Sequence, residues 1–241
     1  MKYKVLSTKK LEPSLIEQVK QNDVDIIEQE FISVKQIFIE GKQKQIIEFA
    51  KSGIQHIVFT SSNAVTAFEK YLEADHTSDL VNWKIFCLSG KTKETIHNSS
   101  HLGNDVIGEA ENASSLSEKI IEQKIDEIIF PCGDKRKDEL PSLLQQAGIK
   151  VHEVIVYKTI ETPVVAAGDI DAILFFSPSA VQSFFSVNQI KKNVVCFAIG
   201  QTTADNITDV TDNKIIVSEF PSQEMMIASV NSYFQNINCY E

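Results

Sequence analysis

Two short polar segments with nearly the same pattern could bind an anion. Thr60-Ser61-Ser62-Asn63 and Ser177-Pro178-Ser179 each follow an apolar run and precede an amphipathic one. Small polar residues at the start of a helix lie beside unpaired backbone N–H groups, which favour a carboxylate or a phosphate. The same residue types are also good N-caps without any ligand, so each serine alone leaves both interpretations open. Recurrence of the turn in both halves of the chain favours a binding role for the set.

A second repeated turn places a glycine after an apolar run and before a threonine. Ser89-Gly90 is followed by Lys91-Thr92, and Gly200-Gln201 by Thr202-Thr203. A glycine there allows close approach of the backbone to an anion, but the spacing is neither a Walker A motif nor a dinucleotide fingerprint. A steric role for either glycine stays open. The two hydroxyls after Gly200 favour a functional role for the second copy.

Tyr157 would lie next to any cleft between the two halves of the chain, because it belongs to a segment that would connect them. It lies in the strand-like segment Val154–Thr159. A tyrosine in a strand usually packs with its ring half-buried, and this interpretation stays open. The histidines His97 and His101 are four residues apart, but the sequence places no carboxylate beside them at ligand spacing. No metal site is therefore predicted.

The segments between these turns alternate between strand-like and helix-like patterns. Strands are predicted at 3–7, 25–31, 55–60, 84–88, 127–131, 150–158, 172–176, 194–199 and 214–217. Helices are predicted from Pro13, at 45–50 with a cap at Gly53, at 64–72, 92–98, 116–123, at 139–146 closed by Gly148, at 180–185, after Gln201 and at 222–233. This alternation predicts an α/β fold with parallel sheets.

The order of the strands predicts two domains. The two to three strands after residue 170 are too few for a covered parallel sheet, so the strands at 3–7 and 25–31 should complete it. We therefore predict a discontinuous domain, 1–36 plus 160–241, with a second domain, 37–159, inserted into it. Passes through Phe38-Ile39 and through 154–162 would join them as a two-stranded β-ladder. The predicted fold is thus two similar, flavodoxin-like α/β halves, whose helix N-termini could face one cleft.

Composition limits the partners and the location. Acidic residues outnumber basic ones by ten, and no Lys/Arg stripe is present, which argues against nucleic acid. No apolar run is long enough for a membrane span, and no export leader is recognised. Cys87, Cys132, Cys196 and Cys239 are dispersed and form no Cys-x-x-Cys pair, which is typical of reduced cytosolic thiols. A small anion stays possible, since backbone amides do not depend on net charge.

Taken together, these segments resemble the uroporphyrinogen-III synthase family over essentially the whole chain. The resemblance rests on Val58–Val65, on Gly133 followed by Leu140-Pro141 and Gly148, on Val154–Thr159, on Phe176–Val181 and on Ala198–Ala204, in that order and spacing. The family closes hydroxymethylbilane, a linear tetrapyrrole polycarboxylate, to uroporphyrinogen III. The last pyrrole ring of the substrate is inverted during closure and water is lost, so the enzyme is a lyase of heme biosynthesis. The resemblance implies no cofactor and no metal.

The resemblance also implies roles for individual residues. Tyr157 would be the proton donor or hydrogen-bond partner of the departing hydroxyl. The contacts to the substrate's acetate and propionate groups would be Ser61, Ser62, Asn63, Ser89, Gly90, Ser177, Pro178, Ser179, Gly200, Gln201 and Thr202, largely through backbone amides. The resemblance implies a cytoplasmic monomer as well, with transient contact to hydroxymethylbilane synthase.

The chain departs from the family pattern at two basic positions. The family often has Thr-Arg-Pro after the first strand, where this chain has Ser7-Thr8-Lys9-Lys10. An arginine often found near the helix after Gly133 is represented by Arg136 or Lys137.

The alternative function is a non-catalytic two-domain protein that closes on a small anionic ligand, as solute-binding receptors do. The missing leader counts against an exported receptor.

Overall fold

The structure is a computed structural model. It describes residues 3–37, 41, 44, 46, 48, 49, 55–73, 83–102 and 105–238. The predicted helix at 45–50 with its Gly53 cap lies largely outside these residues, and the connection through Phe38-Ile39 and Cys239 lie wholly outside them. Among the described residues, no helix is both long and apolar enough to cross a membrane.

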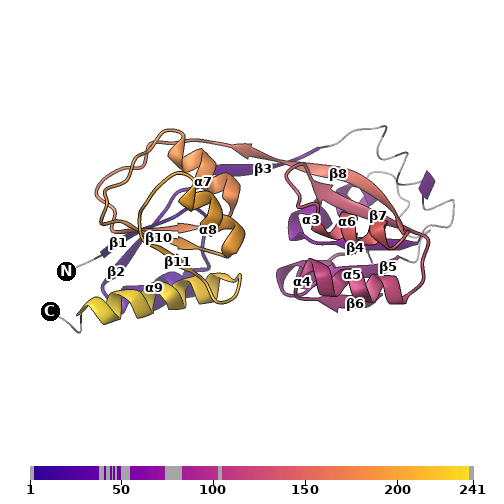
Figure 1. Cartoon of the computed structure of the whole chain (residues 1–241), viewed down its shortest axis with the longest axis horizontal. Helices are drawn as coiled ribbons and strands as arrows, with labels where there is room; N and C mark the ends of the chain where they lie inside the picture. The colour runs from indigo at the N-terminus through magenta and orange to yellow at the C-terminus, as the bar shows by residue number, and fades with distance from the viewer. Residues whose placement is uncertain are drawn as a thin grey trace. The chain divides into compact units, whose positions relative to one another are not determined.

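The chain divides into two compact units. Unit 1 comprises Met1–Ser33 and Ile160–Glu241, and unit 2 comprises Val34–Thr159. The sequence places the first boundary after residue 36, whereas this division falls after residue 33, inside strand β3 (Ile32–Gln36). The second division falls after Thr159, inside β8 (Lys150–Glu161), where the sequence also places it. Strands β3 and β8 are neighbours in the sheet of unit 2 (Figure 1).

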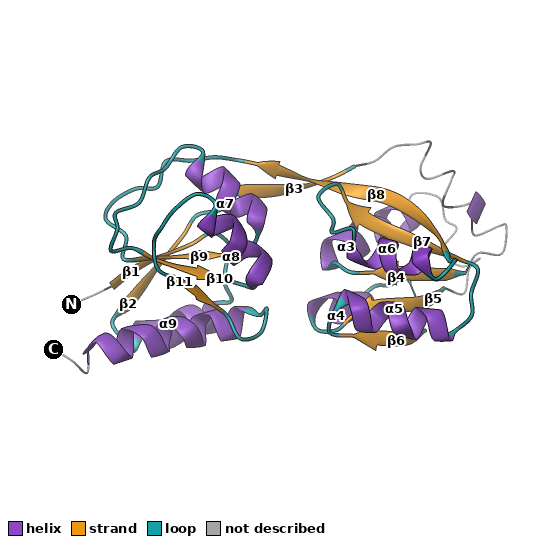
Figure 2. Cartoon of the chain, viewed as in Figure 1, coloured by secondary structure: helices purple, strands orange, loops and turns teal. Residues whose placement is uncertain are grey.

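Unit 1 is a five-stranded sheet in the order β11-β10-β9-β1-β2 with helices on both faces (Figure 2). Its elements are β1 (Tyr3–Ser7), α1 (Pro13–Lys20), β2 (Val24–Glu28), β9 (Ala172–Phe175), α7 (Pro178–Phe185), β10 (Val195–Ala198), α8 (Gln201–Thr208), β11 (Ile215–Val217) and α9 (Gln223–Asn238). All four strand pairings are parallel. The strands from the two ends of the chain therefore complete one sheet, as the strand pattern predicts.

The core of unit 1 lies on both faces of that sheet. Helices α1 and α9 bury Leu15 and Met226 on one face, while α7 and α8 bury Phe184 and Ile207 on the other. The apolar residues of each helix recur at helical spacing, so each helix presents one stripe to the sheet. Pro13 begins α1 at its first turn, where a missing N–H costs no helical hydrogen bond.

Unit 2 is a six-stranded sheet in the order β3-β8-β7-β4-β5-β6. Its further elements are β4 (His56–Phe59), α3 (Ser62–Glu73), β5 (Lys84–Leu88), α4 (Lys91–His97), β6 (Val106–Ala110), α5 (Ala113–Glu122), β7 (Glu127–Gly133) and α6 (Glu139–Gln146). The pairings from β8 to β6 are parallel. Helices α3 and α4 cover one face through Phe68 and Ile96, and α5 and α6 cover the other through Leu116 and Leu144.

The two units share one strand order, displaced along the chain. In unit 1 the first two strands, β1 and β2, lie beside the run β9-β10-β11; in unit 2 the last two, β7 and β8, lie beside the run β4-β5-β6. If β3, which lies beyond β8, is left out and β7 and β8 are counted first, each sheet reads 2-1-3-4-5, which is the flavodoxin-like order. Strands β4 and β9 are each the third strand in this shared order. The repeated turns that follow them therefore lie at equivalent places in the two sheets.

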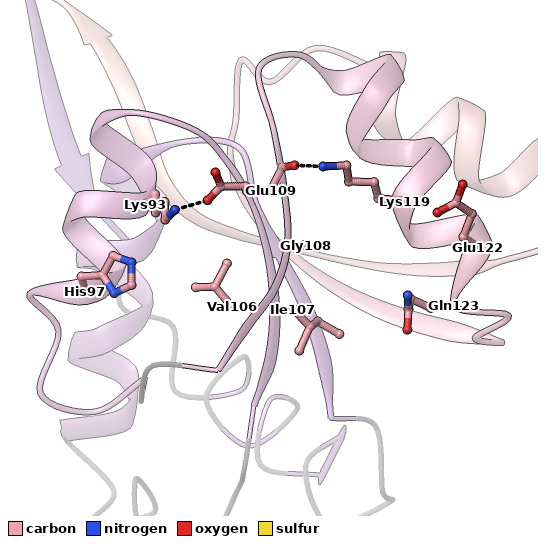
Figure 3. A pocket seen from close by; sticks show the side chains of 9 residues that line it. All are labelled: Lys93, His97, Val106, Ile107, Gly108, Glu109, Lys119, Glu122 and Gln123. Atoms are coloured by element: carbon pink, nitrogen blue, oxygen red, sulfur yellow. Dashed lines mark hydrogen bonds and ion pairs between the residues drawn. The ribbon is translucent and has the colours of Figure 1, made fainter.

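Strand β6 (Val106–Ala110) corrects the sequence prediction, which has no strand there. It is the edge strand of its sheet, and its centre is Gly108 rather than an alternating apolar residue. A Cβ at Gly108 would lie 2.7 Å from the Phe86 ring, so the bare backbone packs on that ring. Outside the strand runs a groove of about 580 Å³, where Lys93 pairs with the Glu109 carboxylate and Lys119 Nζ donates to the Glu109 carbonyl at 2.6 Å (Figure 3). Such charged cover blunts an exposed edge.

Candidate active site

A cavity of about 410 Å³ opens at the carboxyl ends of the unit 2 strands. Its lining includes Thr60 and Ser61 after β4, and Cys132 and Gly133 at the end of β7. The chain reverses its direction across the sheet between β4 and β7, since β5 and β6 lie on one side and β8 on the other. In open α/β sheets, ligands bind outside the carboxyl ends of the strands at this switch point. The cavity therefore lies where this fold holds its ligands.

Tyr157 and Ser61 meet in this cavity. Tyr157 donates its phenol O–H to the hydroxyl oxygen of Ser61 at 3.2 Å. The same oxygen accepts the backbone N–H of Asn63 at 3.2 Å, which fixes the Ser61 side chain at the start of α3. The hydrogen bond connects residues far apart in sequence, and the predicted proton donor lies beside one of the predicted binding serines.

A β-bulge determines where Tyr157 points. Cys132 of β7 pairs with Ile155, but the next residue, Gly133, pairs with Tyr157, so Val156 is an extra residue of β8. Val156 is buried in the cluster beneath α3, and alternation would turn Tyr157 to the opposite face. Instead the Tyr157 ring packs against that same cluster, half-buried. Bulges commonly re-aim a side chain beside an active site.

The surroundings keep Tyr157 protonated. Burial raises the pKa of its phenol above the ordinary value of 10, and the nearby Asp134 carboxylate acts in the same direction. A tyrosine with a raised pKa carries its proton throughout the neutral range. The side chain can therefore donate a hydrogen bond to a group that gains negative charge in the cavity.

The charges of the cavity are mixed. Arg136 and Lys137 line it together with Glu111 and Glu139. Arg136 Nε donates to the Glu153 carboxylate at 2.6 Å, and its terminal nitrogens pair with Glu153 and Asp138. These pairs hold the guanidinium in one place at the cavity.

The other predicted residues of unit 2, which are Ser62, Asn63, Ser89 and Gly90, are not among the residues that line the cavity. Ser62 begins α3, while Asn63 is exposed and lines a different groove beside β3. The backbone N–H of Ser89 already donates to the Ala110 carbonyl at 2.8 Å. Gly90 caps α4 with φ +71°, a conformation that L side chains rarely adopt, so its glycine is required by the backbone.

In unit 1 the predicted residues occupy the corresponding turns. Ser177 caps α7, and its hydroxyl accepts the N–H of Ala180 at 3.2 Å. Pro178 has no N–H to donate and fixes the first turn, which Ser179 continues. Gly200 caps α8 without a side-chain hydrogen bond. Gln201 and Thr202 begin the first turn of α8, and both are exposed.

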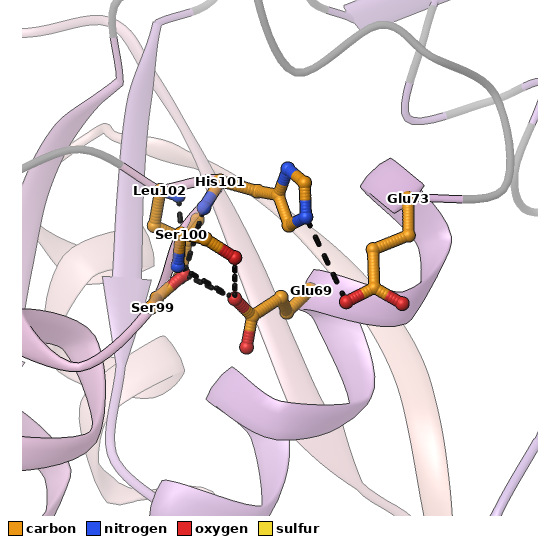
Figure 4. Close-up of polar contacts among 6 residues, drawn as sticks. All are labelled: Glu69, Glu73, Ser99, Ser100, His101 and Leu102. Carbon is orange, nitrogen blue, oxygen red and sulfur yellow. Dashed lines mark hydrogen bonds and ion pairs between the residues drawn. The ribbon is translucent and has the colours of Figure 1, made fainter.

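The fold brings His101 to two carboxylates that the sequence pattern does not connect with it (Figure 4). Ligand atoms of Glu69, Glu73 and His101 lie within 4.8 Å of one another. Each group has an ordinary structural role. Glu73 pairs with the His101 imidazole at 3.7 Å, and Glu69 accepts the Ser99 hydroxyl at 2.8 Å and the Ser100 N–H at 2.9 Å. His97 lies apart from them, in the groove beside β6.

Comparison with known proteins decides the family. The family model described as uroporphyrinogen-III synthase HemD matches residues 4–228. The chain belongs to this family. A uroporphyrinogen-III synthase from Saccharomyces cerevisiae is 28% identical over 120 residues, which are 45% of this chain and 44% of that protein. The match thus spans less than half of the curated relative's length.

Crystal structures of this family share the fold. The uroporphyrinogen-III synthetase of Helicobacter pylori superposes with a TM-score of 0.70 at 15% identity, over 97% of this chain and 100% of that one. A mutant uroporphyrinogen III synthase of the thermophilic bacterium Thermus thermophilus gives a TM-score of 0.66 at 13% identity, over 98% and 99%. At such identities the likeness establishes the fold, and the predicted α/β architecture with parallel sheets is confirmed.

Several residues lining the cavity of this uroporphyrinogen-III synthase family member carry little sequence signal. Glu111 and Asn112 line it from the turn before α5, where Asn112 Oδ1 accepts the N–H of Ser115 at 2.9 Å. The only sequence signal of Asn112 is a weak likeness between Asn112-Ala113-Ser114-Ser115-Leu116 and Phe220-Pro221-Ser222-Gln223-Glu224. Glu153, which holds Arg136, lies on a strand of alternating residues and has no local motif.

Proposed function

We propose that this protein is a uroporphyrinogen-III synthase, which converts hydroxymethylbilane to uroporphyrinogen III. The family assignment supports the reaction class, and the cavity supports its chemistry. The observation that carries the proposal is the protonated phenol of Tyr157, held on Ser61 at the switch point of the unit 2 sheet. The same proposal includes a cytoplasmic monomer. The buried thiols of Cys87, Cys132 and Cys196, none of them in a disulfide, agree with a reducing compartment.

Tyr157 assists loss of the substrate's terminal hydroxyl. Hydroxide is a poor leaving group, and a phenol hydrogen bond stabilises the charge that gathers on the oxygen as the carbon–oxygen bond breaks. Electrons of the neighbouring pyrrole fill the vacated carbon, and loss of the proton from its N–H gives the neutral azafulvene. The departing oxygen takes up one proton and leaves as water. The azafulvene then closes through a spiro-pyrrolenine, which inverts the last ring.

The remaining residues hold the substrate for this closure. The azafulvene is already reactive, so the protein mainly positions the chain ends to prevent closure to the uninverted isomer. Arg136 and Lys137 bind substrate carboxylates at the cavity. Backbone amides at the repeated turns, among them those of Gln201 and Thr202, bind the other acid groups, which allows a chain with excess acid to hold a polycarboxylate.

Product analysis tests the function. The purified protein is given hydroxymethylbilane made by its synthase, the products are oxidised, and the porphyrin isomers are separated. We expect the type III isomer, formed faster than the type I isomer that appears without protein. Type I alone, at the uncatalysed rate, would contradict the proposal.

A further inference from the structure

The cavity contains a close contact between Gly133 and Tyr157. A Cβ built on Gly133 would lie 2.4 Å from Cζ, 2.6 Å from Cε2 and 2.7 Å from the phenol oxygen of Tyr157. These distances are far below van der Waals contact, so the ring occupies the space that any side chain at position 133 would fill. Gly133 is buried at the end of β7, and its partner across the bulge is Tyr157 itself.

The backbone conformation at position 133 does not require a glycine. Its φ lies outside the left-handed range, so an alanine could adopt the same backbone. The clashing atoms are all at the far end of a side chain that can rotate. An alanine should therefore displace the phenol rather than the strands, at a small cost in stability.

We infer that Gly133 is a positioning residue for Tyr157: its missing side chain leaves the space in which the phenol reaches Ser61. The bulge turns Tyr157 towards the cavity, and Gly133 sets how far the ring swings over β7. Ser61 then receives the phenol O–H at 3.2 Å. The inference rests on the proposed function for its catalytic consequence, but the placement of the ring is independent of that function.

The first test compares turnover in Gly133→Ala, Tyr157→Phe and the double variant. We expect Gly133→Ala to lower kcat by roughly 10- to 1,000-fold, like loss of a positioned acid, with little change in KM. The double variant should be no slower than Tyr157→Phe alone, because the phenol through which Gly133 acts is already gone. Wild-type kcat in Gly133→Ala while Tyr157→Phe is slow, or a further loss in the double variant, would overturn the inference.

Gly108→Ala is the matched control. A Cβ there would also press on an aromatic ring, 2.7 Å from Phe86, in the same sheet but beside the groove at β6. Because Phe86 is fully buried, this change should cost at least as much stability as Gly133→Ala. It should nevertheless keep kcat, and an equal loss of kcat in Gly108→Ala would show that the Gly133 effect is merely structural.

The second test observes the ring without the reaction. Ultraviolet titration of phenolate, with Tyr157→Phe to assign the signal, gives the pKa of Tyr157. Burial holds this pKa above its ordinary value, so Gly133→Ala should return it towards about 10 as the ring moves to solvent. An unchanged titration overturns the positioning role. If Tyr157→Phe keeps wild-type turnover while the titration moves, the acid role has failed and the positioning role stands.

Discussion

The phenol oxygen of Tyr157 lies 3.2 Å from the hydroxyl of Ser61, which joins the bulged strand β8 to the turn between β4 and α3. We predict that Tyr157→Phe keeps the fold and loses roughly one to three powers of ten in rate, within or below the range of a general acid. The product should stay type III because the positioning contacts remain. Single-turnover kinetics with isomer analysis measure both, and wild-type chemistry would return Tyr157 to a packing role.

Ser61→Ala and Ser177→Ala separate capping from participation in the site. Each removes a hydroxyl that accepts a first-turn N–H, so each should cost about 0.5–2 kcal/mol of unfolding free energy. Only Ser61 also accepts the Tyr157 phenol. We expect the two variants to lose similar stability in urea denaturation and Ser61→Ala to lose more activity. Equal activity would assign Ser61 to capping alone.

Gln201→Pro tests backbone binding at the start of α8. Proline is tolerated at a first helical position, so the helix should form, but the amide donor is lost. Gln201→Ala loses the same side chain and its hydrogen bond to Asp205 while keeping the N–H. We expect KM for hydroxymethylbilane to rise more in the proline variant. The same KM in both would exclude the Gln201 amide from substrate binding.

Arg136→Ala and Lys137→Ala decide which cation takes the place of the arginine often found in the family. Arg136 is held by Glu153 and Asp138, whereas Lys137 is exposed. An ordered guanidinium loses less side-chain entropy on binding a carboxylate. We expect the larger rise in KM for Arg136→Ala. Glu153→Gln should reproduce part of it by loosening the guanidinium, and a larger effect of Lys137→Ala would reverse the assignment.

Two buried thiols should make stability fall at alkaline pH. Burial raises the pKa of Cys87 to about 11 and that of Cys196 to about 12, from an ordinary value of 9.0. The unfolded chain therefore releases these protons first, so the contribution is fully present below pH 9 and is lost as pH rises through the folded pKa values. Urea denaturation between pH 8 and 11 measures the decline. Cys196→Ala should flatten it, and an unchanged slope would contradict the assignment.

Local patterns predicted much of the fold because the apolar spacing and the end signals of a helix or strand depend on residues close together in sequence. The strand at Lys84–Leu88 and the helix at Glu139–Gln146 have the predicted bounds, since each is an apolar pattern with clear ends. Gly148 ends α6 with φ +83°, as a helix-terminating glycine should. Strand β6 was missed because an edge strand needs few apolar residues, and Gly108 there serves a contact with Phe86 that no local pattern records.

The site was predictable in its residue types and not in its geometry. Ser61 followed from the repeated turn, and Tyr157 from its connecting segment and the family resemblance. Their hydrogen bond depends on the extra residue Val156 in β8. A bulge depends on pairing with β7, which the sequence of β8 alone does not contain. The pairing of Arg136 with Glu153 depends likewise on neighbouring strands in register.

The displaced strand order determines which of the two units can fold first during synthesis. Strand β1 pairs with β2 and with β9, and the second pairing must wait until residues beyond Ala172 leave the ribosome. Every strand of unit 2 lies between β2 and β9 in the chain, so the sheet of unit 2 can close while β9 is still being made. Domains generally fold as units as they emerge. The unit that holds Tyr157 is thus complete first, and an incomplete chain exposes the apolar faces of β1 and β2, which makes unit 1 the aggregation-prone part of a nascent chain.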